Sequence, residues 1–207
     1  MATLLTYALT SLADVKESMG IAASDTSYDN LIVRKINQVT RQIEGYCGRR
    51  FLDTSYTNEE YDSTNTSQLI LRQRPITATT ALALSVRDSG LNSDSWTVVD
   101  TELYFADAPS GVIDLNFGAY GSWNRWRVTY SAGYTTIPED LAEAAATLAA
   151  YYVDNSDGSN IGVTQKKEGA RQINYAGAGL SFEELIKNLG INGILDTYAN
   201  YPLLAGR

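Results

Sequence analysis

Apolar residues recur every three or four positions in several stretches of this chain, which is the spacing of a helix with one buried face. The longest stripe steps through Ile32, Ile36, Val39, Ile43 and Tyr46. A similar stripe of Leu141, Ala145, Leu148 and Tyr152 follows much later. We predict helices near residues 11–19, 29–47, 138–153 and 181–189.

Residues at the helix ends support these bounds. Ser11 suits an N-cap, and Gly20 suits a stop after the first helix. Pro138 is well placed at the first helical position of the third. Ser181 with Glu184 has the spacing of a capping box.

Between the second and third predicted helices the pattern changes to alternation with a period of two. The clearest example is 125–130, where Trp126, Val128 and Tyr130 face one way and polar residues the other. We also predict short strands at 68–71, 81–86, 96–99, 103–105 and 112–115. Their spacing indicates a small antiparallel sheet or sandwich.

These elements predict an α+β fold, mainly an α-helical bundle with an inserted small antiparallel β region. We place the helical domain at 1–53 and 135–207, and the β insertion at 54–134. The alanine run 144–150 permits close packing against another helix, either within the subunit or between subunits.

Two segments follow the third predicted helix. Residues 154–180 are polar and rich in glycine, so we expect a mobile loop or a long hairpin that neighbouring subunits order. The segment 181–207 is unusually apolar, and we predict that it docks onto a neighbour. The interface residues would be Phe182, Leu185, Ile186, Leu189, Ile194, Leu195, Tyr198, Tyr201, Leu203 and Leu204. The alternative is that this tail folds back onto its own bundle.

Composition excludes several classes of protein. The net charge of −8 argues against affinity for nucleic acid, although an acidic channel would let DNA slide. We expect neither a signal peptide nor a membrane span. The single cysteine, Cys47, lies on the apolar side of a predicted helix and is expected to be buried and inert.

Catalytic chemistry is not indicated. The chain has no histidine, which excludes Ser-His-Asp catalysis and histidine zinc sites. The segment 154–160 only superficially resembles a calcium loop, because its glycine comes one position early. Glu59-Glu60 and Glu183-Glu184 are sequence neighbours, which rarely converge on one substrate. We therefore expect no enzyme activity, cofactor or metal.

The fourteen tyrosines and three tryptophans have three possible explanations: core packing, a subunit interface, or a sugar-binding platform. The third leads to an alternative function, a carbohydrate-binding or adhesion module that uses exposed Trp96, Trp123 and Trp126. A carboxylate hydrolase is the least supported alternative.

Three segments, in this order, are similar to a known family. They are 11–16 with 43–51, which ends in Gly48-Arg49-Arg50-Phe51; Leu71-Arg72-Gln73-Arg74-Pro75-Ile76-Thr77; and Val128-Thr129-Tyr130-Ser131-Ala132-Gly133-Tyr134 followed by 137–141. With the order of elements, the chain resembles the head–tail connector (adaptor) proteins of tailed phages.

The resemblance implies a structural protein of the virion neck, made in the host cytoplasm. It implies a homo-oligomeric ring of roughly a dozen copies beneath the portal protein. Such a ring extends the DNA channel without sequence-specific binding and docks a stopper or tail-terminator protein. The resemblance brings no catalytic residues.

Overall fold

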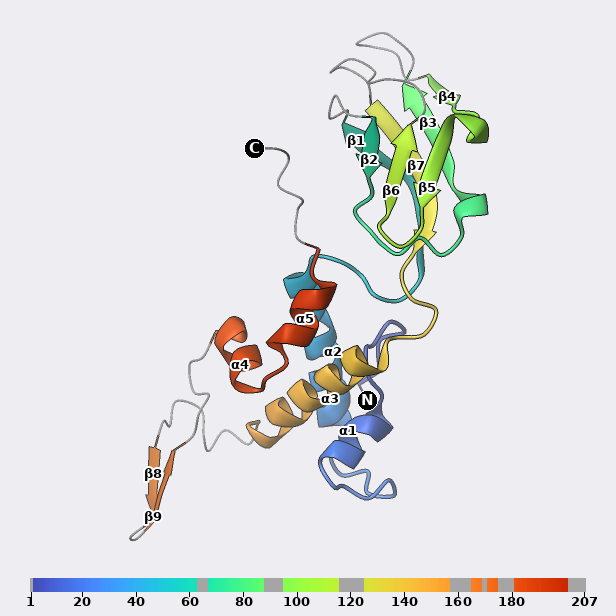
Figure 1. Ribbon diagram of the computed structural model, residues 1–207. Coiled ribbons are helices and arrows are strands. Elements are labelled where there is room, and N and C mark those ends of the chain that lie inside the picture. The colour runs from blue at the N-terminus through green and yellow to red at the C-terminus, as the bar shows by residue number, and fades with distance from the viewer. Residues whose placement is uncertain are drawn as a thin grey trace. The chain divides into compact units, whose positions relative to one another are not determined.

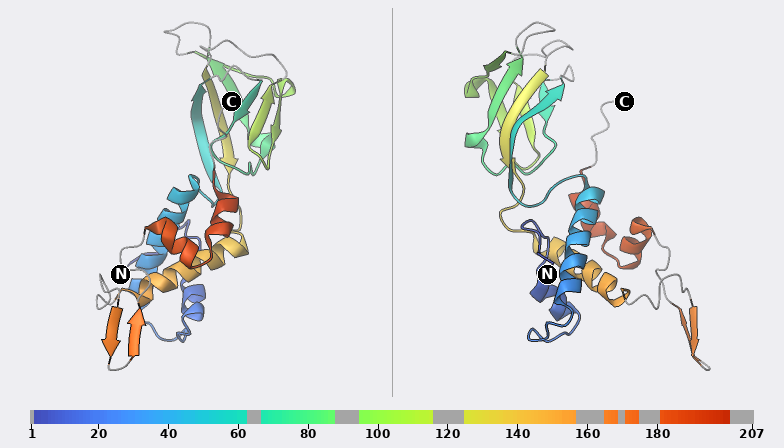
Figure 2. Two further views of the ribbon diagram at one scale, coloured as in Figure 1. Left: turned by 60° about the vertical axis from the view of Figure 1, so that its left-hand side comes forward. Right: turned by 180° about the vertical axis from the view of Figure 1, so that it is seen from behind.

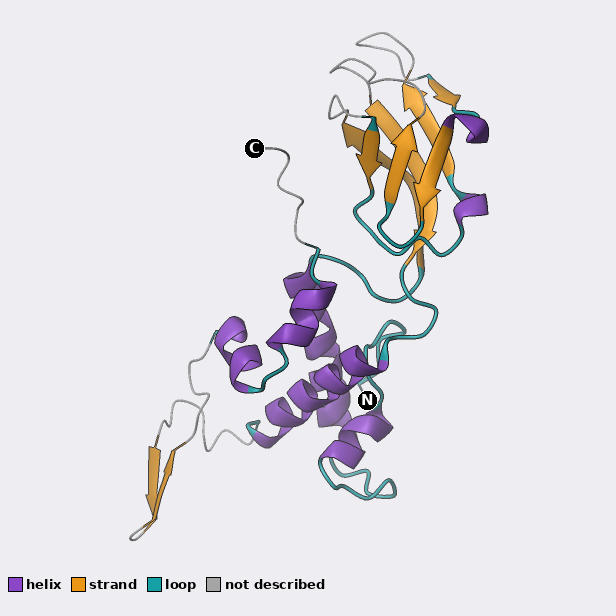
Figure 3. Cartoon of the chain, in the orientation of Figure 1, coloured by secondary structure: helices purple, strands orange, loops and turns teal. Residues whose placement is uncertain are grey.

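A computed structural model describes residues 2–62, 67–87, 95–115, 125–156, 165–168, 171–174 and 181–200. The chain forms two compact units, Met1–Gly48 with Ile137–Arg207, and Arg49–Thr136. Helices gather in the first unit and most strands in the second (Figures 1 and 3). The α+β prediction is confirmed. Our domain bounds of 53/54 and 134/135 differ slightly from this division and stay a prediction.

The helical unit contains five helices within the described residues: α1 (Leu12–Ser18), α2 (Asp29–Cys47), α3 (Glu139–Asp154), α4 (Phe182–Asn188) and α5 (Asn192–Tyr198). The first four lie where the sequence pattern predicts them. The fifth was not predicted, because Gly190 and Gly193 suggested an interrupted tail. No described helix is long and apolar enough to cross a membrane.

Both serine caps form as expected, whereas Pro138 is the N-cap of α3 and not its first helical residue. In α4 the Ser181 backbone N–H donates to Glu184 Oε2 at 2.9 Å, and the Glu184 N–H donates to Ser181 Oγ at 3.3 Å. The pair Ser11 and Asp14 makes the same reciprocal bonds at α1. These bonds satisfy backbone donors that a short helix would otherwise leave without partners.

The core of the helical unit lies between α2 and α3, which cross one another in all views (Figure 2). The predicted stripe of α2 is buried from Ile32 to Ile43. In α3 the buried alanines 144, 145, 146 and 149 let the helix approach α1 and α2 closely. The alanine run therefore packs within the subunit.

A buried lysine joins α1 to the start of α2. The Lys16 ammonium lies 2.6 Å from Asp29 Oδ1 and donates to the Asp25 carbonyl at 2.7 Å. Its side chain is only 6% exposed. Because a buried charge without a partner is costly, these contacts hold the loop between the two helices against α1.

The second unit, here called the β unit, is a two-layer sandwich. Its strands are β1 (Thr54–Asp62), β2 (Gln68–Ile70), β3 (Ala83–Arg87), β4 (Trp96–Val98), β5 (Tyr104–Asp107), β6 (Val112–Leu115) and β7 (Arg125–Ala132). One sheet has the order β1-β7-β3-β4 and the other β2-β6-β5. All pairs within these two sheets are antiparallel.

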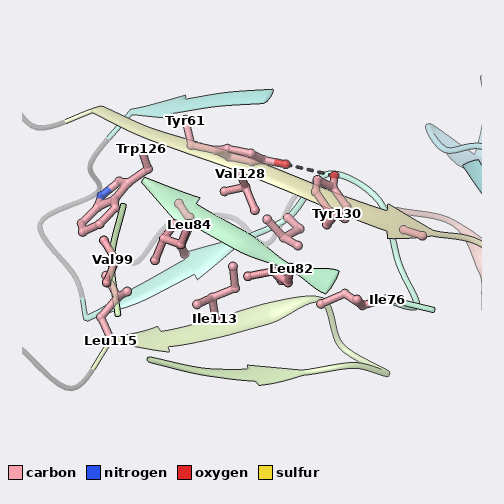
Figure 4. Close-up of a cluster of buried hydrophobic side chains, with 13 residues drawn as sticks. Tyr61, Ile76, Leu82, Leu84, Val99, Ile113, Leu115, Trp126, Val128 and Tyr130 are labelled. Atoms are coloured by element: carbon pink, nitrogen blue, oxygen red, sulfur yellow. Dashed lines mark hydrogen bonds between the residues drawn. The ribbon is translucent and has the colours of Figure 1, made fainter. Parts of the chain in front are cut away.

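Side chains from both sheets meet in one apolar core (Figure 4). Trp126, Val128 and Tyr130 of β7 are buried there, as the alternation predicts. Leu84 of β3 and Ile113 of β6 come from the two layers and are fully buried. Each sheet therefore has one inner apolar face and one outer face.

Strand β1 was not predicted, because its sequence is polar and lacks a clear alternation. It pairs with β7 from Thr54 to Asp62, with a shift in register between Tyr56 and Glu59. At the shift, Asn58 has a φ of 54° and its N–H donates to Thr129 Oγ1 at 3.0 Å. Tertiary pairing with β7 therefore determines this strand.

In the segment 154–180 the structure describes one hairpin, β8 (Gln165–Glu168) with β9 (Arg171–Asn174). A long hairpin was one of the two forms expected there. The other residues from 157 to 180 lie outside the described ranges, so the predicted mobility stays a prediction.

Candidate functional site

The ten predicted interface residues of the tail fall into three groups. Leu185, Ile186 and Leu195 are buried in the core of the helical unit. Phe182, Leu189, Ile194 and Tyr198 are partly exposed. Tyr201, Leu203 and Leu204 lie outside the described residues. Only residues of the last two groups therefore remain candidates for a contact with another protein.

Helix α5 is attached to α2 by polar bonds as well as apolar contacts. The Tyr46 hydroxyl donates to Asp196 Oδ1 at 2.6 Å. The Asn200 N–H donates to the Cys47 carbonyl at 2.7 Å. Cys47 itself is buried, as expected. The tail as far as residue 200 thus folds back on its own bundle, which is the alternative that the sequence left open.

One of the three tryptophans proposed for a sugar-binding platform cannot take part in it. Trp126 is only 2% exposed and belongs to the β-unit core, so it cannot contact a sugar. Trp96 is partly buried, and the Arg127 guanidinium lies 4.0 Å from its ring centroid. Trp123 lies outside the described residues. Core packing and a cation–π contact account for the two described tryptophans.

Parts of the three segments that carry the family resemblance meet at one end of the β unit, where the chain enters and leaves it. We call this region, formed by 49–53, 73–77 and 131–134, the entry junction. The Gly133 N–H donates to the Pro75 carbonyl at 2.9 Å, and the Tyr134 N–H to the Phe51 carbonyl at 2.6 Å. Three distant stretches of sequence are therefore joined through their backbones.

A buried arginine lies at the centre of the entry junction. The Arg49 guanidinium lies 5.2 Å from the Phe51 ring centroid and 5.6 Å from that of Tyr134. It also donates to the Arg74 carbonyl. Two of its partners, Arg74 and Tyr134, lie 25 and 85 positions along the chain, so sequence spacing could not reveal these contacts.

A second polar cluster lies at the edge of the β-unit core, where Glu59 accepts from Tyr61, Tyr130 and Arg72 at 2.5, 2.7 and 3.1 Å. Burial would raise the pKa of Glu59, but these hydrogen bonds outweigh it and hold the pKa below its ordinary value. Burial and the neighbouring carboxylate raise the pKa of both tyrosines, which therefore remain protonated donors.

This cluster is structural. Its one carboxylate is fully engaged by three donors, so it has no free pair of acid and base groups converging on an open site. Among the described residues, no group of three or more Cys, Asp or Glu side chains is placed to hold a metal.

Within the part of the chain that the structure describes, large apolar side chains are exposed mainly on the β unit. They are Tyr28, Ile70, Val98, Leu103 and Phe105, and all but Tyr28 belong to that unit. Phe105 and Val98 are the most accessible, at 64% and 71%. Such residues mark candidate contact surfaces for another protein.

Comparison with models of protein families identifies the family of this chain. The model of the head completion protein family matches residues 8–168, which include the entry junction and most of both units. The chain belongs to the head completion protein family. It is thus a structural, non-enzymatic protein, and the resemblance noted in the sequence is confirmed. None of the curated proteins compared with it matches.

Solved structures extend the fold match of this head completion protein beyond residue 168. A chain in the neck of an empty gene transfer agent (GTA) particle, computed with C6 symmetry, is 16% identical with a TM-score of 0.54. That match covers 99% of this chain and 96% of the other. A chain in the native particle's neck, computed with C12 symmetry, is 15% identical with a TM-score of 0.52, covering 100% and 99%.

Proposed function

We propose that this head completion protein is the head–tail connector of a tailed-phage particle. It forms a ring under the portal in the neck, extends the DNA channel, and docks a stopper or tail protein. The observation that carries the proposal is the similarity, over nearly the full length of both chains, to proteins in the neck of GTA particles. The C12 symmetry used for one of those necks supports a ring of twelve copies.

The charge of the chain is compatible with a channel component. DNA must pass through the neck without being retained, and a net charge of −8 disfavours retention of phosphates. An adhesion module is the weaker candidate, because Trp126 is buried.

The test is electron microscopy of particles from a host that produces the phage with and without this gene. We expect wild-type necks to contain a ring of this chain between portal and tail. Without the chain, DNA-filled heads and free tails should accumulate separately. A particle that lacks the chain yet joins heads to tails normally would overturn the proposal.

The purified subunit is expected to be monomeric in dilute solution and to form rings in the particle or at high concentration. The reason is that rings of this kind assemble on a portal template. Light scattering over a concentration series tests this. A tight dimer whose mass does not change with concentration contradicts the ring.

The tail remains the proposed contact with the portal or a neighbour, through its partly exposed residues and those beyond 200. A chain ending after Asn200 would retain α5 and its bond to Cys47. We expect this variant to melt like the wild type but to fail to join heads to tails. A normal yield of joined particles would show that the interface does not need Tyr201, Leu203 or Leu204.

A further inference from the structure

The outer face of the sheet β2-β6-β5 combines acidic groups with exposed apolar side chains. Phe105 is 64% exposed and Ile70 is 46% exposed. The alternate residues of the same strands are buried in the core, so the remaining residues face outward. Read across the register, they are Gln68, Asp114 and Phe105 in one row, and Ile70, Val112 and Asp107 in the next. We call these two rows the acidic face.

The negative charge of the acidic face does not depend on residues outside the described ranges. The three strands contain Asp107 and Asp114 and no basic residue. The stretch 88–124, which includes β5 and β6, has six acidic residues and no lysine or arginine. The segment 63–66, before β2, has no charged residue. The first arginine after β2, Arg72, is paired with a glutamate of β1 at 3.1 Å.

A surface of opposite charge lies on helix α2. Arg34, Gln38 and Arg41 follow at the spacing of one helical face, and all three are exposed. Within the described part of the chain, neither arginine has an acidic partner. The two carboxylates of α2, Asp29 and Glu44, are partly buried, and Asp29 is paired with a lysine of α1. We call the exposed face of α2 the arginine stripe.

We propose that the acidic face of one subunit binds the arginine stripe of the next copy of this chain. Charge complementarity identifies a second copy as the occupant, because the charges of one surface are all acidic and those of the other are all basic. Phe105 lies in the same row as Asp114, so the acidic face offers a guanidinium both an aromatic ring and a carboxylate.

The spacing of the charges allows two ion pairs to form at once. Arg34 and Arg41 are seven residues apart on a helix, which places them about 10 Å apart. Asp107 and Asp114 lie on paired strands, two residues out of register, and are therefore about 8 Å apart. Long arginine side chains span the difference.

The contact has a direction, because its two surfaces belong to different units of the chain. The β unit of one copy would bind the helical unit of the next. Such a contact is heterologous, and repeating it produces a closed ring when the rotation per subunit closes. The inference rests on the proposed ring and names the surfaces that would build it.

The test uses two full-length variants, Phe105→Arg on the acidic face and Arg41→Glu on the arginine stripe. Both positions are exposed, so both variants should fold, with melting temperatures close to wild type. Each should weaken self-association at least about tenfold, because each places like charges opposite one another. The matched controls are Val98→Arg, at a 71% exposed position of the other sheet, and Lys187→Glu, at an exposed position of α4. Both controls should associate as wild type does.

Mixing the two variants is the decisive step. Each variant keeps one intact surface, and the two intact surfaces are complementary. An equimolar mixture should therefore regain association, with a one-to-one dimer as its smallest product in light scattering. A folded mixture that stays monomeric, controls as weak as the variants, or a wild type that is monomeric at every concentration would each overturn the inference.

Duplex DNA is the competing ligand for the arginine stripe, and the same variants distinguish it. If Arg41→Glu associates as wild type does but loses binding to a DNA duplex, the stripe binds phosphates and the inference is wrong. A ring of this chain seen in particle necks despite any of these results would leave the proposed function standing.

Discussion

Gly133 lies at a position of the entry junction that leaves no room for a side chain. Its φ is 129°, and a Cβ atom there would lie 2.7 Å from backbone atoms of Leu52 and Asp53. Those atoms belong to the segment just before β1, which must approach closely for the Asp53 N–H to donate to the Tyr134 carbonyl. A side chain at this position would therefore separate the strands of the entry junction.

We expect Gly133→Ala to lower the free energy of unfolding by on the order of 1–3 kcal/mol, since it combines backbone strain with a backbone clash. Gly45→Ala is the control. Gly45 lies within α2 with open space around it, and alanine there should stabilise by about 0.5–1 kcal/mol. Chemical denaturation measures both. Equal effects of the two substitutions would refute the clash.

The lowered pKa of Glu59 predicts that the stability of the protein depends on pH. Its pKa is lower in the folded than in the unfolded state, so its contribution is present above the ordinary value of 4.5 and is lost as pH falls through the folded-state pKa. We expect Glu59→Gln to destabilise by about 1–3 kcal/mol near neutral pH. The difference from wild type should shrink as the pH drops below 4.5.

Denaturation of both proteins across a pH series checks this. The Glu17→Gln variant is a suitable control, because Glu17 is exposed on α1 and lies outside the Glu59 cluster. If the stability difference between the Glu59→Gln variant and the wild type does not change with pH, the charged network is contradicted.

Among the elements, α5 is the one whose role changed most between sequence and structure. The sequence favoured docking of this region onto a neighbour. In the structure Leu195 is fully buried, and its carbonyl lies 3.6 Å from Cys47 Sγ. The helix is part of the folded unit, and its remaining exposed residues are what a neighbour could contact.

We expect Leu195→Ala to lower the free energy of unfolding of the helical unit by about 2–5 kcal/mol, as a cavity in a packed core does. Ile194→Ala, at the partly exposed neighbouring position, should cost less than half as much. Thermal unfolding followed by far-ultraviolet circular dichroism measures both. A chain stopped after Gly190 should lose helical stability for the same reason. A fully stable truncated chain would show that α5 is not needed by the core.

At the scale of the whole molecule, the two compact units each have a core of their own. All three tryptophans, Trp96, Trp123 and Trp126, lie in the β unit, whereas the five described helices lie in the other. Tryptophan fluorescence therefore reports on one unit, and helical circular dichroism mainly on the other.

We predict that the two signals respond separately. Leu195→Ala should lower the midpoint of the helical signal and leave the fluorescence midpoint unchanged, and Gly133→Ala should do the reverse. Identical shifts of both midpoints for either variant would mean that the units unfold as one, against the predicted domain organisation.

The sequence pattern was sufficient to predict the helices with a regular stripe and a cap, the clearest strands, the α+β class and the family. In these segments the apolar period and the capping residues act locally, over a few positions. Strand β1, helix α5 and the entry junction depend instead on contacts between distant parts of the chain. Strand β1 is polar and exists through its pairing with β7, and α5 is short and is held by bonds to α2. Arg49 and Gly133 acquire their roles from partners far along the chain. A local pattern cannot encode such contacts, because they form only after the chain has folded.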